Sequence, residues 1–135
     1  MWGHLHIEHF DLIRSVHHNK VIGSSFWTGS LTTFTKKNPQ FRRFVMDKET
    51  NLPAKIETYI FDLDKWTSKD QEGVTWEFDH EMTSYYNLTD LRPSEMGRLS
   101  DSVMLEEEIA LKMRNAQSGY ANNERYNTCD KKCRH

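Results

Sequence analysis

Two different spacings of apolar residues divide the chain near its middle. In the first half, apolar and polar residues alternate or form short runs separated by turn residues, which is the pattern of β-strands. The runs recur roughly every 15 to 20 residues and predict consecutive antiparallel strands in one meander. The predicted strands cover residues 7–13, 21–27, 41–47 and 58–63.

The second half changes to helical spacing. Residues 76–86 are rich in aromatic side chains, and we interpret them as a strand followed by a loop or a helical turn. Pro93 suits a first helical turn, since its missing N–H would have no partner there. The acidic run 106–108 predicts a second helix that starts near Leu105, with Gly119 as its C-cap. One helical face collects the apolar residues Met96, Leu99, Val103, Ala110 and Met113.

The composition describes a polar chain that folds and carries little net charge. Of its 135 residues, 36% are hydrophobic and 28% are charged, so its core should be thin. Aromatic residues make up 12% of the chain, which argues against disorder. The net charge of -2 gives no electrostatic reason to expect nucleic-acid binding. No stretch reaches the ~18 apolar residues of a transmembrane helix, and residues 1–4 lack the basic and apolar regions of a signal peptide.

A pair of histidines near the start is the first candidate for chemistry. On an extended chain, His4 and His6 project to the same side with Cα atoms ~6.5 Å apart. This spacing suits one ligand on each of two neighbouring metal ions, or one ion held by both imidazoles. Gly3 would let the backbone come close to an ion or a substrate. On the spacing alone, two ordinary surface histidines at the start of the chain are the favoured interpretation.

Further motifs follow the histidine pair in a fixed order. They are Gly3-His4-Leu5-His6-Ile7-Glu8-His9-Phe10, Ser30-Leu31-Thr32-Thr33-Phe34, Asn38-Pro39-Gln40-Phe41-Arg42, Tyr86-Asn87-Leu88-Thr89-Asp90-Leu91-Arg92-Pro93-Ser94 and Cys129-x-x-x-Cys133-Arg134. Together they resemble the acid sphingomyelinase group, which comprises acid sphingomyelinase and the sphingomyelinase-like phosphodiesterases of the calcineurin-like metallophosphoesterases. The resemblance runs over nearly the whole chain, with weak identity between the motifs.

The resemblance implies an α+β fold and a two-zinc site. Residues 1–65 would be the last strands of a metallophosphoesterase β-sandwich, and residues 66–135 a helical C-terminal subdomain. His6 would bind the first zinc ion and His4 the second. Glu8 matches an acidic position of the family and is a candidate acceptor that holds a ligating imidazole. The substrate implied is sphingomyelin, or a nucleotide or other phosphodiester.

The chain departs from the family in its missing metal ligands. The Asp-x-His and Gly-Asn-His motifs that precede the histidine pair in the family do not occur anywhere in these 135 residues. Two imidazoles bind zinc weakly, so we expect the isolated chain to be inactive and to be the C-terminal part of a phosphodiesterase. The alternatives are a truncated, non-catalytic secreted paralogue that acts as a binding protein, and a standalone domain that binds one zinc ion.

The remaining features concern the secretory pathway. With the resemblance, Cys129 and Cys133 are expected to form a disulfide, although reduced thiols remain the alternative. Asn87-Leu88-Thr89 is an N-glycosylation sequon. Both features indicate a secreted, extracellular or lysosomal protein. We assign no role to the other histidines, among them His9 and His80, which are expected to be structural or solvated.

Overall fold

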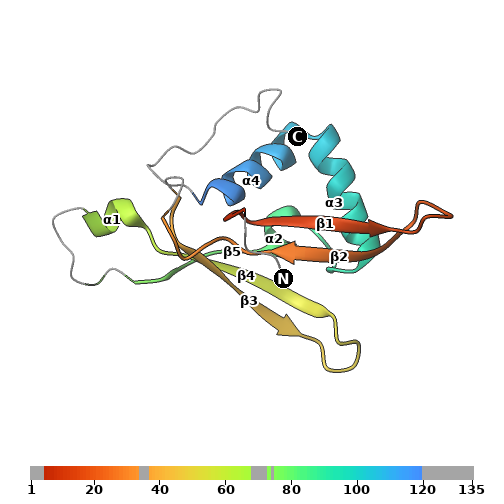
Figure 1. Cartoon of the computed structure of the whole chain (residues 1–135), viewed down its shortest axis with the longest axis horizontal. Helices are drawn as coiled ribbons and strands as arrows, with labels where there is room; N and C mark the ends of the chain where they lie inside the picture. Colours follow the sequence, from red (N-terminus) through yellow and green to blue (C-terminus); the bar gives the residue numbers. More distant parts are fainter. Residues whose placement is uncertain (1–4, 34–36, 68–72, 74, 120–135) are drawn as a thin grey trace.

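The computed structural model describes residues 5–33, 37–67, 73 and 75–119. His4, Cys129 and Cys133 lie outside the described residues, so their predicted roles stay predictions. Along the described chain, four strands are followed by a short helix, a fifth strand and then three helices. Figure 1 shows the helices α3 and α4 beside the β1–β2 hairpin, while β3 and β4 extend away from them.

The first two strands form a separate hairpin. β1 (His9–Arg14) pairs antiparallel with β2 (Val21–Trp27) in a register that places His9 opposite Trp27. A turn that includes Asn19 at φ 51° joins them, as the sequence predicts. β2 has the predicted bounds, whereas β1 begins two residues later than predicted. The inward face of β1 carries Phe10, which is buried.

The other three strands form a meander of their own. β3 (Gln40–Met46), β4 (Pro53–Ile60) and β5 (Glu77–Glu81) pair antiparallel in the order β3-β4-β5. The prediction of one continuous meander is therefore wrong. Residues 28–39 separate the two sheets; they contain glycine and a proline that has no N–H to pair.

β4 differs from its predicted range. It starts at Pro53 and ends at Ile60, while Leu63 begins the short helix α1 (Leu63–Thr67) instead of ending a strand. The side chain of Asp62 accepts hydrogen bonds from the backbone N–H groups of Asp64 (3.0 Å) and Lys65 (3.1 Å). Capping of this kind turns the chain into a helix against its apolar, strand-like pattern.

The later helices follow local signals closely. α2 (Met82–Tyr86) is capped by the side chain of Glu81, α3 (Pro93–Leu105) starts at its proline, and α4 (Glu107–Ser118) ends before Gly119. Gly119 has φ 60°, a left-handed conformation that glycine adopts at little cost, which confirms its prediction as a C-cap.

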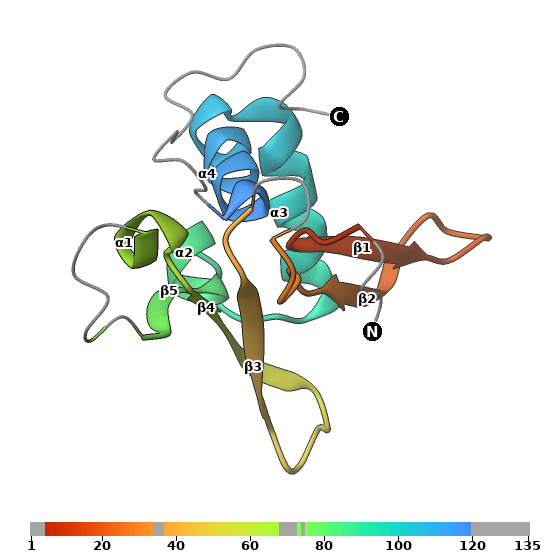
Figure 2. The ribbon, with the colours of Figure 1, turned by 60° about the vertical axis from the view of Figure 1, so that its left-hand side comes forward.

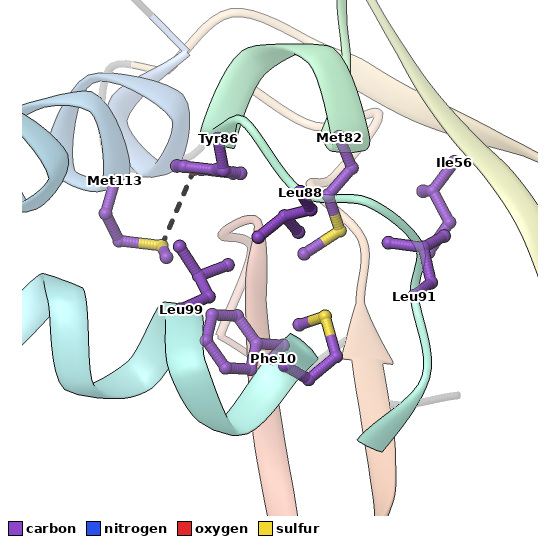
Figure 3. Close-up of a cluster of buried hydrophobic side chains, with 9 residues drawn as sticks. Phe10, Ile56, Met82, Tyr86, Leu88, Leu91, Leu99 and Met113 are labelled. Atoms are coloured by element: carbon purple, nitrogen blue, oxygen red, sulfur yellow. Dashed lines mark hydrogen bonds between the residues drawn. The ribbon is translucent and has the colours of Figure 1, made fainter. Parts of the chain in front are cut away.

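The core lies where α2 and α3 meet both sheets. Figure 3 shows its side chains pointing toward one another, with the Tyr86 hydroxyl 3.7 Å from the Met113 sulfur. The helical face predicted from the sequence is confirmed, since Met96 and Leu99 are fully enclosed. The core cluster comprises Phe10, Ile56, Met82, Tyr86, Leu88, Leu91, Met96, Leu99 and Met113.

The structure joins segments on both sides of residue 65. β5 pairs with β4, and α2 packs against both strands. Neither the division at residue 65 nor the metallophosphoesterase sandwich is tested by this arrangement, and both stay predictions. None of the helices in the described part of the chain is both long and apolar enough to span a bilayer.

Gly29 provides a test of the junction between the two sheets. A Cβ added to Gly29 would lie 2.6 Å from the Cβ of Gln40, whose amide donates to the Ala116 carbonyl (3.3 Å). Because that atom is next to the backbone and cannot swing away, we expect Gly29→Ala to lower the free energy of unfolding by about 1–3 kcal/mol.

The matched control for this prediction is Gly23→Ala. A Cβ there would meet the terminal methyl carbon of the exposed Ile13 at 3.3 Å, and this methyl can move. We expect a change of roughly 0.5 kcal/mol or less, as for most surface substitutions. Urea titrations of both variants check the prediction, and equal losses would contradict it.

Candidate functional site

A buried carboxylate, Glu8, organises the site next to the histidine pair. Its side chain is only 2% exposed and forms an ion pair with Arg42, whose side chain is equally buried. Glu8 also accepts a hydrogen bond from the Thr58 hydroxyl (2.9 Å) and contacts the Nε2 atom of His80 (3.0 Å). Glu8 lies just before β1, and its three partners come from β3, β4 and β5. Its side chain therefore joins the start of the first hairpin to all three strands of the other sheet.

The partners of Glu8 are themselves held in place. Arg42 donates from Nε to the Thr58 hydroxyl (3.2 Å) and from Nη1 to the Trp27 carbonyl (2.9 Å). His80 contacts Asp79 through Nδ1 (2.7 Å). Two carboxylates, one guanidinium and one imidazolium balance one another in charge, which a buried cluster requires. We call the residues Glu8, Arg42, Thr58, Asp79 and His80 the buried ion cluster.

The cluster shifts the ionisation of its members. Burial alone would raise the pKa of Glu8, but the Arg42 charge and the hydrogen bonds from His80 and Thr58 outweigh burial and lower this pKa to about 2. Burial alone would lower the pKa of His80, but its contacts with Asp79 and Glu8 raise it to about 9. Both groups are consequently charged at neutral and mildly acidic pH.

The structure brings the predicted motifs together. Glu8 belongs to the histidine motif, and Arg42 ends the Asn-Pro-Gln-Phe-Arg motif. The ring of Tyr86, from the Tyr-Asn-Leu motif, lies edge-on to His80 with their centroids 6.5 Å apart. His6 and Thr32 join the Ser-x-Thr motif to the histidine motif, with the His6 Nδ1 atom 3.4 Å from the Thr32 hydroxyl.

The Asn-Pro-Gln-Phe-Arg motif also joins the end of α4 to the sheet. Asn38 donates to the Gly119 carbonyl (2.9 Å) and accepts from the backbone N–H of Leu63 (3.1 Å). Asn38 and Gln40 are both buried. The polar side chains of this motif thus satisfy backbone groups at the ends of two helices.

His6 does not have the backbone geometry assumed for the histidine pair. Its φ is 55°, which is left-handed rather than extended, and β1 begins only at His9. The extended geometry assumed at His6 is therefore wrong, whereas the spacing between His4 and His6 stays a prediction because His4 lies outside the described residues. Within the described ranges, the structure contains no group of three or more His, Cys, Asp or Glu side chains that could hold a metal ion.

Two other sequence predictions have clear structural settings. Asn87 is exposed and left-handed, with φ 54°, immediately after α2, so its side chain is accessible for a glycan.

His80, to which the sequence assigned no role, is a central member of the buried ion cluster. No periodic signal marked it, because its partners are far away in the chain; Glu8 precedes it by 72 positions.

Comparison with known proteins gives one specific similarity. The chain is 32% identical over 71 residues to sphingomyelin phosphodiesterase B of Dictyostelium discoideum, a match that covers 53% of this chain and 11% of that protein. No protein-family model matches the chain. The similarity supports a sphingomyelinase-like relationship for a chain that spans only a small part of the relative's length.

Proposed function

We propose that this chain is the C-terminal part of a zinc-dependent phosphodiesterase of the sphingomyelinase type, secreted or lysosomal, and that it is inactive by itself. The observation that carries the proposal is the convergence of separate motifs around Glu8, two residues from His6. The similarity to sphingomyelin phosphodiesterase B supports the same class of reaction. Sphingomyelin or another phosphodiester would be the substrate.

The chain's own contribution would be to present His6 and His4 to the two zinc ions. Imidazole is a good zinc ligand, and the Thr32 hydroxyl near the His6 Nδ1 atom can orient the ring. A zinc pair supplies a hydroxide nucleophile and stabilises charge on the phosphoryl oxygens. The proposed inactivity of the isolated chain rests on its sequence, in which the Asp-x-His and Gly-Asn-His motifs of the family do not occur.

The buried ion cluster supports this role by fixing the backbone next to His6. Because Glu8 pairs with Arg42 and bonds to Thr58, the backbone just after His6 is tied to both β3 and β4. A ligand must be held in place by its surroundings to bind metal well. Glu8 and His80 also both stay charged between pH 4.5 and 6.5, a range that suits a lysosomal or acidic extracellular setting.

The first experiment assays the purified chain. With zinc added, we expect no turnover of sphingomyelin or of a chromogenic phosphodiester. Turnover that His4→Ala abolishes would contradict the proposed inactivity.

The second experiment sequences the transcript upstream of Met1. An in-phase reading frame with Asp-x-His and Gly-Asn-His motifs is expected. The protein that it encodes should hydrolyse a phosphodiester and lose roughly 100-fold or more activity in His6→Ala, as expected when a metal-ligand interaction is removed. His17→Ala, at an exposed turn, is the matched control. An in-phase stop codon upstream would instead favour the non-catalytic binding protein.

A further inference from the structure

The outer face of β3-β4-β5 carries an exposed aromatic strip. Phe41 and Tyr59 stack in parallel with their centroids 5.0 Å apart, and Trp76 meets Phe41 edge-on at 4.9 Å. The strip continues through Phe78, which lies 5.7 Å from Tyr59. We define the aromatic strip by the residues Phe41, Tyr59, Phe61, Trp66, Trp76 and Phe78.

The register of the sheet explains why these rings gather. Phe41 pairs with Tyr59, and Tyr59 pairs with Phe78, so three neighbouring strands place an aromatic ring at the same level. Alternate residues of β4, such as Ile56, point into the core instead. Figure 2 shows the β3–β4 hairpin projecting away from α3 and α4.

The strip is open to solvent to an unusual degree. Exposed fractions are 37% for Phe41, 38% for Trp76, 44% for Trp66 and 57% for Phe78. Single exposed apolar residues are ordinary, but a contiguous patch of aromatic rings marks an interaction surface. Tyrosine and tryptophan favour boundaries between an apolar phase and water, where one end of the ring stays wet.

The charges bordering the strip indicate the partner. Arg43 pairs with Glu57 (2.5 Å) and lies over the Tyr59 ring, and Lys65 pairs with Glu77 (2.6 Å). These two cations of the described face are thus each paired with a carboxylate and add little net charge beside the strip. A strongly charged partner would gain little from such a surface, whereas a zwitterionic lipid surface complements it.

We propose that the aromatic strip docks onto a zwitterionic lipid surface, with Trp66, Trp76 and Phe78 inserted at the level of the headgroups. The choice of lipid rests on the proposed function, because a sphingomyelinase-type substrate resides in a bilayer. The docking itself needs neither zinc nor turnover. Its failure would therefore leave the proposed phosphodiesterase class untouched.

The primary experiment is co-sedimentation of the intact chain with phosphatidylcholine vesicles. Binding is expected without phosphatidylserine, unchanged when phosphatidylserine is added, and insensitive to salt. The double variant Trp76→Ser/Phe78→Ser should bind roughly tenfold more weakly, because two aromatic side chains no longer leave water. Ile13→Ser, which removes a 54% exposed side chain outside the strip, is the matched control and should bind normally.

A second measurement does not depend on the stability of the serine variant. Brominated phosphatidylcholine should quench the chain's tryptophan fluorescence, and Trp66→Phe/Trp76→Phe should lose most of that quenching. Trp27→Phe should keep it, since Trp27 lies on β2 and donates its indole N–H to Asp11.

Three results would overturn the proposal. The first is no binding to phosphatidylcholine vesicles, and the second is binding only to anionic vesicles at low salt. The third is self-association that depends on Phe78 and occurs without vesicle binding, which would make a second copy of the chain the occupant of the strip. Sedimentation velocity of the intact chain and of Trp76→Ser/Phe78→Ser distinguishes this last outcome.

Discussion

Glu8→Gln is expected to lower the free energy of unfolding by about 3–5 kcal/mol at pH 6, the largest effect of any substitution considered. Gln removes the charge and leaves the shape nearly unchanged, so the Arg42 guanidinium would stay buried without its counter-ion. The bonds to Thr58 and His80 would weaken at the same time. Urea titration followed by circular dichroism measures the loss.

The matched control is Glu57→Gln. Glu57 lies on the same sheet and pairs with Arg43, which faces solvent. An exposed pair of this kind contributes roughly 1 kcal/mol or less, so the control should be nearly as stable as the natural chain. Equal losses in Glu8→Gln and Glu57→Gln would show that the buried ion cluster adds nothing beyond a surface ion pair.

His80→Gln is expected to cost about 3 kcal/mol at pH 6, the free energy that corresponds to raising the imidazole pKa from 6.5 to about 9. Because the folded pKa lies above the unfolded value, folding takes up a proton between these two pH values. The stability that the charged His80 provides is therefore complete below pH 6.5 and is lost as the pH rises to 9.

The pH profile gives this prediction its distinctive readout. The stability difference between the natural chain and His80→Gln should shrink steadily from pH 6.5 to 9. At acidic pH, the stability of the chain depends on the ionisation of Glu8. Because the pKa of Glu8 is lowered in the folded chain, its contribution to stability is complete above pH 4.5 and is lost as the pH falls toward 2. A His80→Gln difference that is constant with pH would mean that His80 contributes packing rather than charge.

Much of the secondary structure was predictable because its signals are local. β2 occupies the predicted residues, Pro93 begins α3, and Gly119 ends α4. Each depends on neighbours a few positions away: an alternating pattern, a proline with no N–H, or a glycine that tolerates positive φ. The helix at Leu63 was missed because the Asp62 side chain, rather than apolar spacing, ends the strand.

The candidate site was only partly predictable. The sequence drew attention to His6, Glu8 and Arg42 as members of motifs, and the structure places all three in one region. The sequence could not reveal that Glu8 pairs with Arg42 and His80, since those contacts depend on sheet pairing. The expected role of Glu8 as an acceptor for a metal-bound imidazole stays a prediction.

By itself, the sequence determined the local elements, the apolar helical face and the motifs with which the resemblance was recognised. Only the tertiary structure decided that the strands divide into two sheets, and that Glu8 and His80, 72 positions apart, share one buried cluster. The physical reason is range. Backbone propensity and capping act within a few residues, whereas burial and ion pairing depend on which distant segments the fold brings together.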